Sequence, residues 1–155
     1  MDLTIITPTR NRFDYLKKLI NYYQHFNYKG KIFFLDSSQK KIFLETKNYL
    51  KKNNNKNIFH YRILARPFEC TKLIAPKIKT KYVCWSGDDD YFIVSGLRKS
   101  VKILNNNKKI NALNGLTISS NFKKKRKLIK SYVHYENFNS LHKKPISRLN
   151  QIFNE

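Results

Sequence analysis

Short apolar runs alternate with helix-periodic segments through about the first hundred residues, and this alternation constrains the fold more than any other feature. The runs are rich in β-branched and aromatic residues, which is typical of strands buried on both faces. The expected strands cover residues 3–7, 31–35, 58–64, 81–86 and 111–119. Strands that alternate with helices form βαβ units. The sequence therefore predicts an α/β fold, with a doubly wound, mostly parallel sheet and helices on both faces.

The segments between the apolar runs carry apolar residues at helical spacing, as from Phe13 to Tyr23. The expected helices cover residues 13–23, 39–52, 70–78 and 97–104, and Pro76 must end or kink the third. Residues 128–135 suit a further strand, and residues 147–153 suit the start of a helix. The chain has 155 residues and no internal repeat, so we expect one domain over residues 1–155.

Short polar groups follow three of the expected strands. Residues 7–12 follow the first strand, residues 36–38 the second, and residues 87–90 the fourth. Ligands of open α/β sheets bind in the crevice beyond the carboxyl ends of the strands, so these groups are expected to line one pocket. A glycine-rich phosphate loop does not follow the first strand, which argues against a dinucleotide-binding or P-loop enzyme.

The triplet Asp88-Asp89-Asp90 is the most informative of these groups. The chain has only ten acidic residues, so three in a row are expected by chance about 0.04 times. Adjacent carboxylates at the end of a buried strand are unfavourable unless a cation neutralises them. Carboxylates are the hard oxygen ligands that suit Mg²⁺ or Mn²⁺. The triplet therefore predicts a divalent metal site; the alternative is an acidic turn in which Asp88 caps the next helix.

Other polar residues at the strand ends suit a nucleotide. Asp36 can accept a hydrogen bond from a ribose hydroxyl or a base N–H, or it can cap the following helix. Arg10 and Arg12, in the first strand-to-helix turn, can pair with diphosphate oxygens, and Lys72 is a further candidate of the same kind. In so basic a chain these three residues can equally be ordinary surface charges.

These motifs together resemble the inverting GT-A glycosyltransferases of glycosyltransferase family 2. Residues 5–12 are similar to the opening strand of that family and its Pro-Thr-x-Asn-Arg turn, and residues 34–38 to the second strand, whose aspartate contacts the nucleotide. Residues 82–90 resemble the strand that carries the Asp-x-Asp metal motif, although Gly87 stands where the first aspartate is often found. The resemblance covers about residues 1–120.

The resemblance implies transfer of a sugar from a nucleotide-sugar donor, commonly UDP-linked, to a hydroxyl of a glycan or other acceptor, with Mn²⁺ or Mg²⁺. The metal would be held among Asp88, Asp89 and Asp90. Donor-binding candidates are Thr7, Pro8, Thr9, Arg10, Arg12, Asp36, Lys72, Gly87 and Asp88.

An inverting transfer also needs a general base. After Asp90 the chain offers only Glu136 and the terminal Glu155, so Glu136 is the candidate base. Because enzymes of this family continue well past this length, we expect the chain to be truncated at its acceptor-binding part, or the base to come from elsewhere. A catalytically inactive fragment that keeps the fold is the corresponding alternative.

The net charge of +22 favours polyanionic partners: nucleic acid, an anionic lipid surface or nucleotide phosphates. Lysines that accompany asparagines along the chain fit a compositional bias equally well. The run Lys123–Lys127, with Tyr132 and Tyr135 nearby, would suit single-stranded nucleic acid. No recognition motif is visible and the acidic triplet would repel phosphates without a metal, so nucleic acid is not the expected partner. We expect this run to be a hairpin or solvated edge, with contact to an anionic membrane as the alternative.

The sequence has no apolar run near the length of a membrane span, and its N-terminus does not suit a signal peptide. Cys70 and Cys84 lack metal-ligand spacing and are expected to be buried or partly buried thiols in a reducing compartment. The expected location is cytoplasmic, including the periphery of the inner face of a membrane.

Overall fold

The computed structural model describes residues 1–53, 56–122 and 128–134, and it describes side chains as far as Ser119. The chain divides into two compact units, Met1–Asn111 and Ala112–Glu155. The expectations of one domain over residues 1–155 and of a truncated acceptor-binding part stay predictions.

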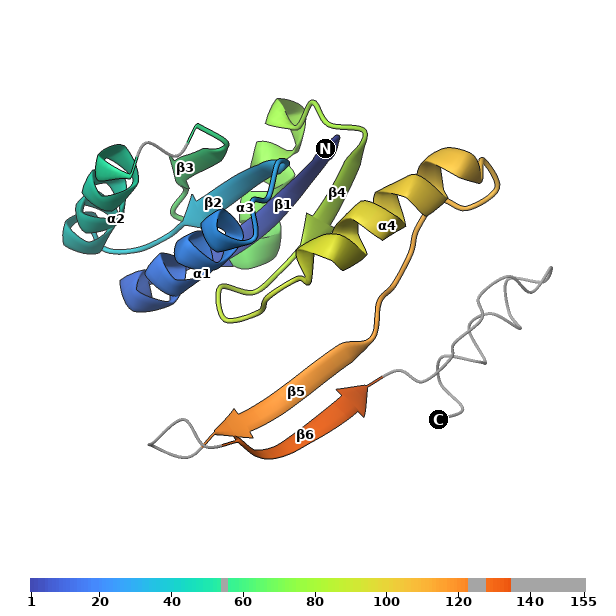
Figure 1. The fold of residues 1–155 in the computed structure, drawn as a ribbon. Coiled ribbons are helices and arrows are strands. Elements are labelled where there is room, and N and C mark those ends of the chain that lie inside the picture. Colours follow the sequence, from blue (N-terminus) through green and yellow to red (C-terminus); the bar gives the residue numbers. More distant parts are fainter. Residues whose placement is uncertain (54–55, 123–127, 135–155) are drawn as a thin grey trace. The chain divides into compact units, whose positions relative to one another are not determined.

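The first unit contains a four-stranded parallel sheet in the order β3-β2-β1-β4 (Figure 1). Its strands are β1 (Leu3–Thr9), β2 (Lys31–Asp36), β3 (Ile58–Arg62) and β4 (Tyr82–Trp85). Its helices are α1 (Phe13–His25), α2 (Lys40–Lys52), α3 (Pro67–Ile74), a 3₁₀ turn (Ala75–Lys77) and α4 (Val94–Asn106). The predicted α/β fold with a parallel sheet is confirmed.

Helices cover both faces of this sheet, because alternate residues of the central strands enter two separate cores. Ile5, Ile32 and Phe34 pack with Leu16, Leu19 and Ile20 of α1 on one face. Ile6, Phe33 and Leu35 pack with Cys70 and Ile74 of α3 on the other face. This period of two along β1 and β2 is the reason that both strands read as unbroken apolar runs.

The strand register brings the three polar groups to one edge. Thr9 at the end of β1 pairs with Asp36 at the end of β2. On the other side of β1, the Ser86 N–H donates to the Ile6 carbonyl at 2.9 Å, so the turn after β4 begins beside the end of β1. The carboxyl ends of the strands therefore meet as predicted for a parallel sheet.

The helix expected over residues 70–78 begins earlier, at Pro67, and ends at Ile74. Proline is favourable at the first helical position, and Glu69 accepts a hydrogen bond from the Arg66 N–H at 3.0 Å, which caps the helix start. Pro76 lies in the 3₁₀ turn that follows, consistent with its expected helix-ending effect.

The second unit contains an antiparallel pair, β5 (Thr117–Phe122) with β6 (Leu128–His134). The fifth strand expected over residues 111–119 is therefore wrong in its extent and in its sheet, because residues 111–116 form no strand and, among the described residues, β5 pairs only with β6. Asn111, Asn114 and Gly115 have low strand propensity, which accounts for the late start of β5. The strand expected at residues 128–135 is confirmed. The run Lys123–Lys127 and the helix expected at 147–153 lie outside the described residues.

No helix in the described part of the chain is both long enough and apolar enough to cross a bilayer. Cys70 and Cys84 are both free thiols; Cys70 is buried and Cys84 is half-buried. Burial raises the pKa of Cys84 to about 12, so this thiol stays protonated at neutral pH.

Candidate functional site

The turn after β4 folds the aspartate triplet back on itself. Ser86 Oγ donates to the Gly87 carbonyl at 3.0 Å, and the Gly87 N–H donates to Asp90 Oδ2 at 3.2 Å. A Cβ atom at Gly87 would come within 2.8 Å of Asp90 Oδ2 and 3.1 Å of Asp89 Oδ1. Gly87 therefore belongs to the site because it leaves room for the carboxylates.

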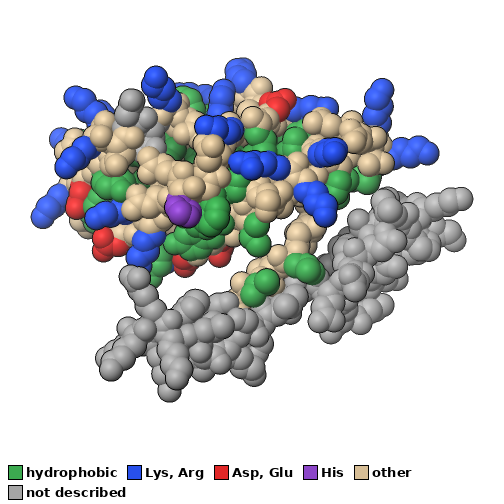
Figure 2. All heavy atoms as spheres, viewed as in Figure 1, with side chains coloured by type: hydrophobic (Ala, Val, Ile, Leu, Met, Phe, Trp, Pro, Cys, Tyr) green, Lys and Arg blue, Asp and Glu red, His purple; other side chains and the backbone are tan. Residues whose placement is uncertain are grey.

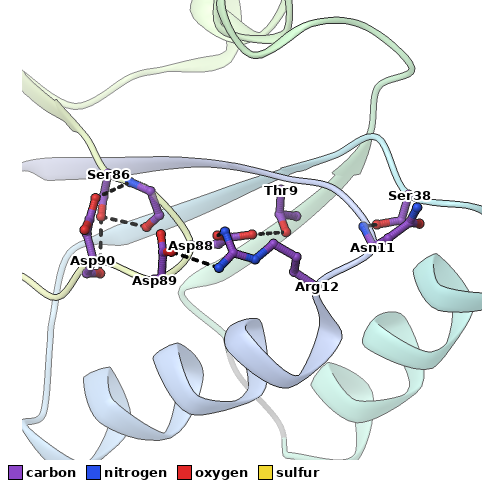
Figure 3. A network of polar contacts seen from close by, with 9 residues as sticks. Thr9, Asn11, Arg12, Ser38, Ser86, Asp88, Asp89 and Asp90 are labelled. Carbon is purple, nitrogen blue, oxygen red and sulfur yellow. Dashed lines mark hydrogen bonds and ion pairs between the residues drawn. The ribbon is translucent and has the colours of Figure 1, made fainter. Parts of the chain in front are cut away.

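Asp88 and Asp89 converge on one cationic group, the guanidinium of Arg12 (Figure 3). Arg12 Nη1 lies 2.7 Å from Asp88 Oδ1, and Arg12 Nη2 lies 2.8 Å from Asp89 Oδ2. The other oxygen of Asp88 accepts a hydrogen bond from Thr9 Oγ1 at 2.7 Å. The guanidinium also lies 3.9 Å from the ring centroid of Tyr15. These contacts join the turn after β1 to the turn after β4.

The two carboxylates differ in their electrostatic environment. Burial raises the pKa of Asp88, and the hydrogen bond from Thr9 and the charge of Arg12 oppose that effect only in part. The hydrogen bond from Arg12 lowers the pKa of Asp89, whose side chain is 51% exposed, and the same bond raises the pKa of Arg12. One guanidinium thus faces two carboxylates, one mostly buried and one exposed.

Asn11 is a structural residue of the site that was not among the sequence candidates. Its φ of 55° lies in the left-handed region, which asparagine tolerates better than most residues. Its N–H donates to Ser38 Oγ at 2.7 Å, and its Oδ1 accepts from the Gln39 N–H at 3.0 Å. These bonds hold the turn after β1 against the start of α2 and so direct Arg12. An asparagine in a strand-to-helix turn was the available signal.

Asp36 is fully buried and its oxygens are engaged within the protein. Asp36 Oδ2 lies 2.8 Å from His60 Nε2, and Asp36 Oδ1 accepts from the Ser38 N–H at 2.8 Å. Burial alone would raise the pKa of Asp36, but the contact with His60 and the hydrogen bonds from Ser38 lower it. Asp36 supports the loop after β2, and His60 was missed because its position on β3 becomes informative only when β3 pairs with β2.

A cleft of about 660 Å³ opens beside these residues. Five sequence-predicted residues line it: Pro8, Thr9, Arg10, Arg12 and Asp88. Other lining residues come from the segment that enters α3 and from its first turn, and they include Leu64, Arg66 and Glu69, which sequence reasoning missed.

The other candidates lie apart from the cleft lining. Thr7 is buried, and its Oγ1 has no hydrogen-bond partner among the described residues. Lys72 is exposed on α3 and does not line the cleft. Asp36, Gly87, Asp89 and Asp90 do not line it either, and Glu136 lies outside the described residues.

The three comparisons with known proteins give one informative likeness. No protein-family model matches the chain, and no curated protein matches it in sequence. Among solved structures, the crystal structure of S. aureus TarS 1-349 is similar, with a TM-score of 0.54 and 16% identity over 68% of this chain. The match covers 33% of the TarS chain, so this chain spans about a third of that structure. The likeness shows the fold alone, a Rossmann-like α/β arrangement with a parallel sheet between helices.

Proposed function

We propose that this chain is the donor-binding part of a metal-dependent glycosyltransferase that transfers a sugar from a nucleotide-diphosphate donor, UDP-linked, to an acceptor hydroxyl. The observation that carries this proposal is the convergence of Asp88 and Asp89 on one cationic group beside a cleft at the carboxyl ends of a parallel sheet. The likeness to TarS, a GT-A-type glycosyltransferase, supports the same general kind of protein.

The residues present fit a divalent cation that the substrate helps to bind. Asp88 and Asp89 already pair with the two terminal nitrogens of one guanidinium, at 2.7 and 2.8 Å, so both carboxylates lie beside one cationic group. No cluster of three His, Cys, Asp or Glu side chains able to hold a metal occurs in the part of the chain that the structure describes. Magnesium commonly takes one or two carboxylates and completes its shell with phosphate oxygens and water. When bound, Mg²⁺ or Mn²⁺ would neutralise charge on the departing diphosphate.

The side chains of the cleft suit the phosphates of such a donor. Arg10, Arg12 and Arg66 line it. One guanidinium group can donate two parallel hydrogen bonds to the oxygens of a phosphate group. In the transfer, the acceptor oxygen bonds to the anomeric carbon as the bond from that carbon to the diphosphate oxygen breaks. The nucleoside diphosphate leaves with the electron pair, and the hydroxyl proton passes to a base. We retain Glu136 as the candidate for that base.

Calorimetric titration with UDP and UDP-sugars, with and without Mn²⁺, tests the proposal. We expect binding that depends on Mn²⁺ and that weakens at least about tenfold in Asp88→Asn and Asp89→Asn, since each substitution removes one charged oxygen ligand. Glu45→Gln, at an exposed acid of α2 away from the cleft, is the matched control and should bind as the parent does. Nucleotide binding that is unchanged in both aspartate variants would contradict the metal role.

A donor-hydrolysis assay addresses catalysis separately. Manganese-dependent release of sugar from a UDP-sugar by the parent chain, lost in Asp89→Asn, supports a working transferase site. Tight nucleotide binding without hydrolysis, and without transfer when acceptors are added, would favour the inactive-fragment alternative.

A further inference from the structure

Lysines gather at the amino ends of the parallel strands, at the edge of the sheet opposite to the cleft. They lie in the segments that lead into the strands and in the segment that follows α4. These residues, which we call the lysine edge, are Lys29, Lys31, Lys79, Lys81, Lys108 and Lys109.

Direct contacts bring these segments together. The Met1 amino group donates to the Lys29 carbonyl at 3.5 Å, which places the N-terminus beside the segment before β2. The Lys81 N–H donates to Asp2 Oδ1 at 2.9 Å, and Lys81 Nζ donates to Asn105 Oδ1 at 3.0 Å. The entrance to β4 therefore lies between the N-terminus and the last turn of α4, so the lysines of separate segments occupy one surface.

The positive charge of this edge is not neutralised within the described residues. The described residues form three ion pairs, which involve Arg12 and His60, and none of these pairs involves a lysine. Of the described acidic residues, only Asp2 lies at a strand amino end. Figure 2 shows Lys and Arg side chains spread over the visible face of the first unit, with few acidic side chains among them. The last turn of α2 adds Lys51 and Lys52, where they also complement the helix dipole.

The lysine edge also exposes apolar side chains. Phe26, at the end of α1, is 49% exposed, and Ile103, in the last turn of α4, is 37% exposed. Lysines and exposed apolar side chains at the same edge suit the surface of an anionic bilayer, where each basic residue contributes about 1 kcal/mol and apolar side chains enter the interfacial layer.

We propose that the lysine edge binds the surface of an anionic lipid bilayer. The basic side chains at this edge are lysines except for Arg98, whose Nη2 donates to the Asn27 carbonyl at 3.2 Å. By contrast, Arg10, Arg12, Arg62 and Arg66 lie at the carboxyl ends of the strands. Arginine is the residue favoured for paired contacts with nucleic-acid phosphates and bases. Lysines without such geometry suit the diffuse field of a lipid surface, so the charge pattern favours a membrane over nucleic acid.

This orientation has a structural consequence for the cleft. β1 has seven residues, and a strand rises about 3.3 Å per residue, so the cleft would lie roughly 23 Å above the docked edge. Its opening would therefore face water rather than lipid and stay accessible to a dissolved nucleotide. The proposed contact does not depend on the transferase proposal, because none of its residues belongs to the cleft.

Sedimentation of the full chain with vesicles tests this inference. We expect binding to phosphatidylcholine vesicles that contain about 30 mol% phosphatidylglycerol, little binding to pure phosphatidylcholine, and a steep loss of binding with salt. The variant Lys29→Gln/Lys79→Gln/Lys108→Gln/Lys109→Gln should bind anionic vesicles at least about tenfold more weakly, since about 1 kcal/mol per lysine is roughly fivefold each.

The matched control Lys17→Gln/Lys18→Gln/Lys41→Gln/Lys47→Gln removes the same charge from exposed positions of α1 and α2. This control variant should bind anionic vesicles less than about threefold more weakly than the parent, because these lysines lie away from the proposed contact. An equal loss in both variants would overturn the inference, because net charge alone would then explain binding. Failure of the parent chain to bind anionic vesicles would also overturn it. So would a larger loss of binding to a DNA duplex than to vesicles in the lysine-edge variant, which would assign the edge to nucleic acid.

Discussion

Replacing Arg12 with methionine tests the physical argument for the site in the absence of any ligand. The substitution keeps an unbranched side chain but removes the only cationic partner that the described residues give Asp88. Asp88 has a side chain that is only 6% exposed, and it keeps one hydrogen bond from Thr9. We expect Arg12→Met to lower the free energy of unfolding at pH 7.

The size of this effect follows from the burial of the two partners. Removing the partner of a fully buried charge costs about 3–5 kcal/mol. Arg12 is 36% exposed and its attraction is partly screened by water, so we reduce the expected loss to about 1–2 kcal/mol. The double variant Arg12→Met/Asp88→Asn should recover part of this loss, because it leaves no unpaired charge.

Urea denaturation between pH 3 and pH 7 measures the effect and its cause. Burial raises the folded-state pKa of Asp88, and loss of Arg12 raises it further. A carboxyl with a raised folded pKa stabilises the protein fully below its unfolded pKa, about 3.9, and loses that contribution as pH rises through the folded pKa. The destabilisation by Arg12→Met should therefore shrink as the pH falls through the folded pKa of Asp88, and it should be smallest below the unfolded pKa.

Arg10→Met is the matched control, because Arg10 lies in the same turn, is exposed and forms no ion pair among the described residues. Its unfolding free energy should match that of the parent. Equal stabilities for Arg12→Met and Arg10→Met, or a difference that persists unchanged at pH 3, would refute the reasoning.

Three further predictions concern the residues that support the site. Gly87→Ala should keep the fold but weaken manganese-dependent nucleotide binding in calorimetry, because its Cβ would displace the Asp90 carboxylate 2.8 Å away; normal binding would contradict the crowded turn. Asp36→Asn should lower the unfolding free energy by about 2–3 kcal/mol at pH 7, because it removes the charge from a buried pair. The pKa of Asp36 is lowered in the folded state, so its contribution is present above the ordinary carboxyl pKa and is lost as pH falls through the folded value. The urea midpoint of the variant should accordingly vary less with pH on the acid side than that of the parent. Asn11→Val should lower the unfolding free energy by about 1–3 kcal/mol in thermal denaturation, since a β-branched residue is strained at a φ of 55°. Asn11→Gly should lower the unfolding free energy less than Asn11→Val does, and the reverse order would argue against backbone strain.

The sequence was sufficient for the parallel sheet because each central strand carries its own signal. Leu3–Thr7 and Lys31–Leu35 are apolar on both faces, and the segments that follow them have helical periodicity. Once the strands are parallel, their carboxyl ends meet, so the grouping of residues 7–12 with 36–38 and 87–90 followed from topology alone. The convergence of Thr9, Arg12 and Asp88 near the cleft is consistent with that prediction.

The fifth strand shows where local pattern stops being informative. Residues 111–119 contain apolar side chains, but nothing in that segment specifies whether a strand joins the parallel sheet or pairs with residues 128–134. Pairing depends on hydrogen bonds to another segment, so the periodicity of one strand cannot identify its partner.

Residue types and the alternation of strands with helices, both readable from the sequence, thus predicted which side chains share an edge. Tertiary structure alone decided what each side chain does there: Asp36 turns inward to His60, and Asp88 and Asp89 turn to Arg12, more than seventy residues away along the chain. The physical reason is that burial, partner distance and the resulting pKa are properties of the folded surroundings of a group, and identical aspartates acquire different values of each.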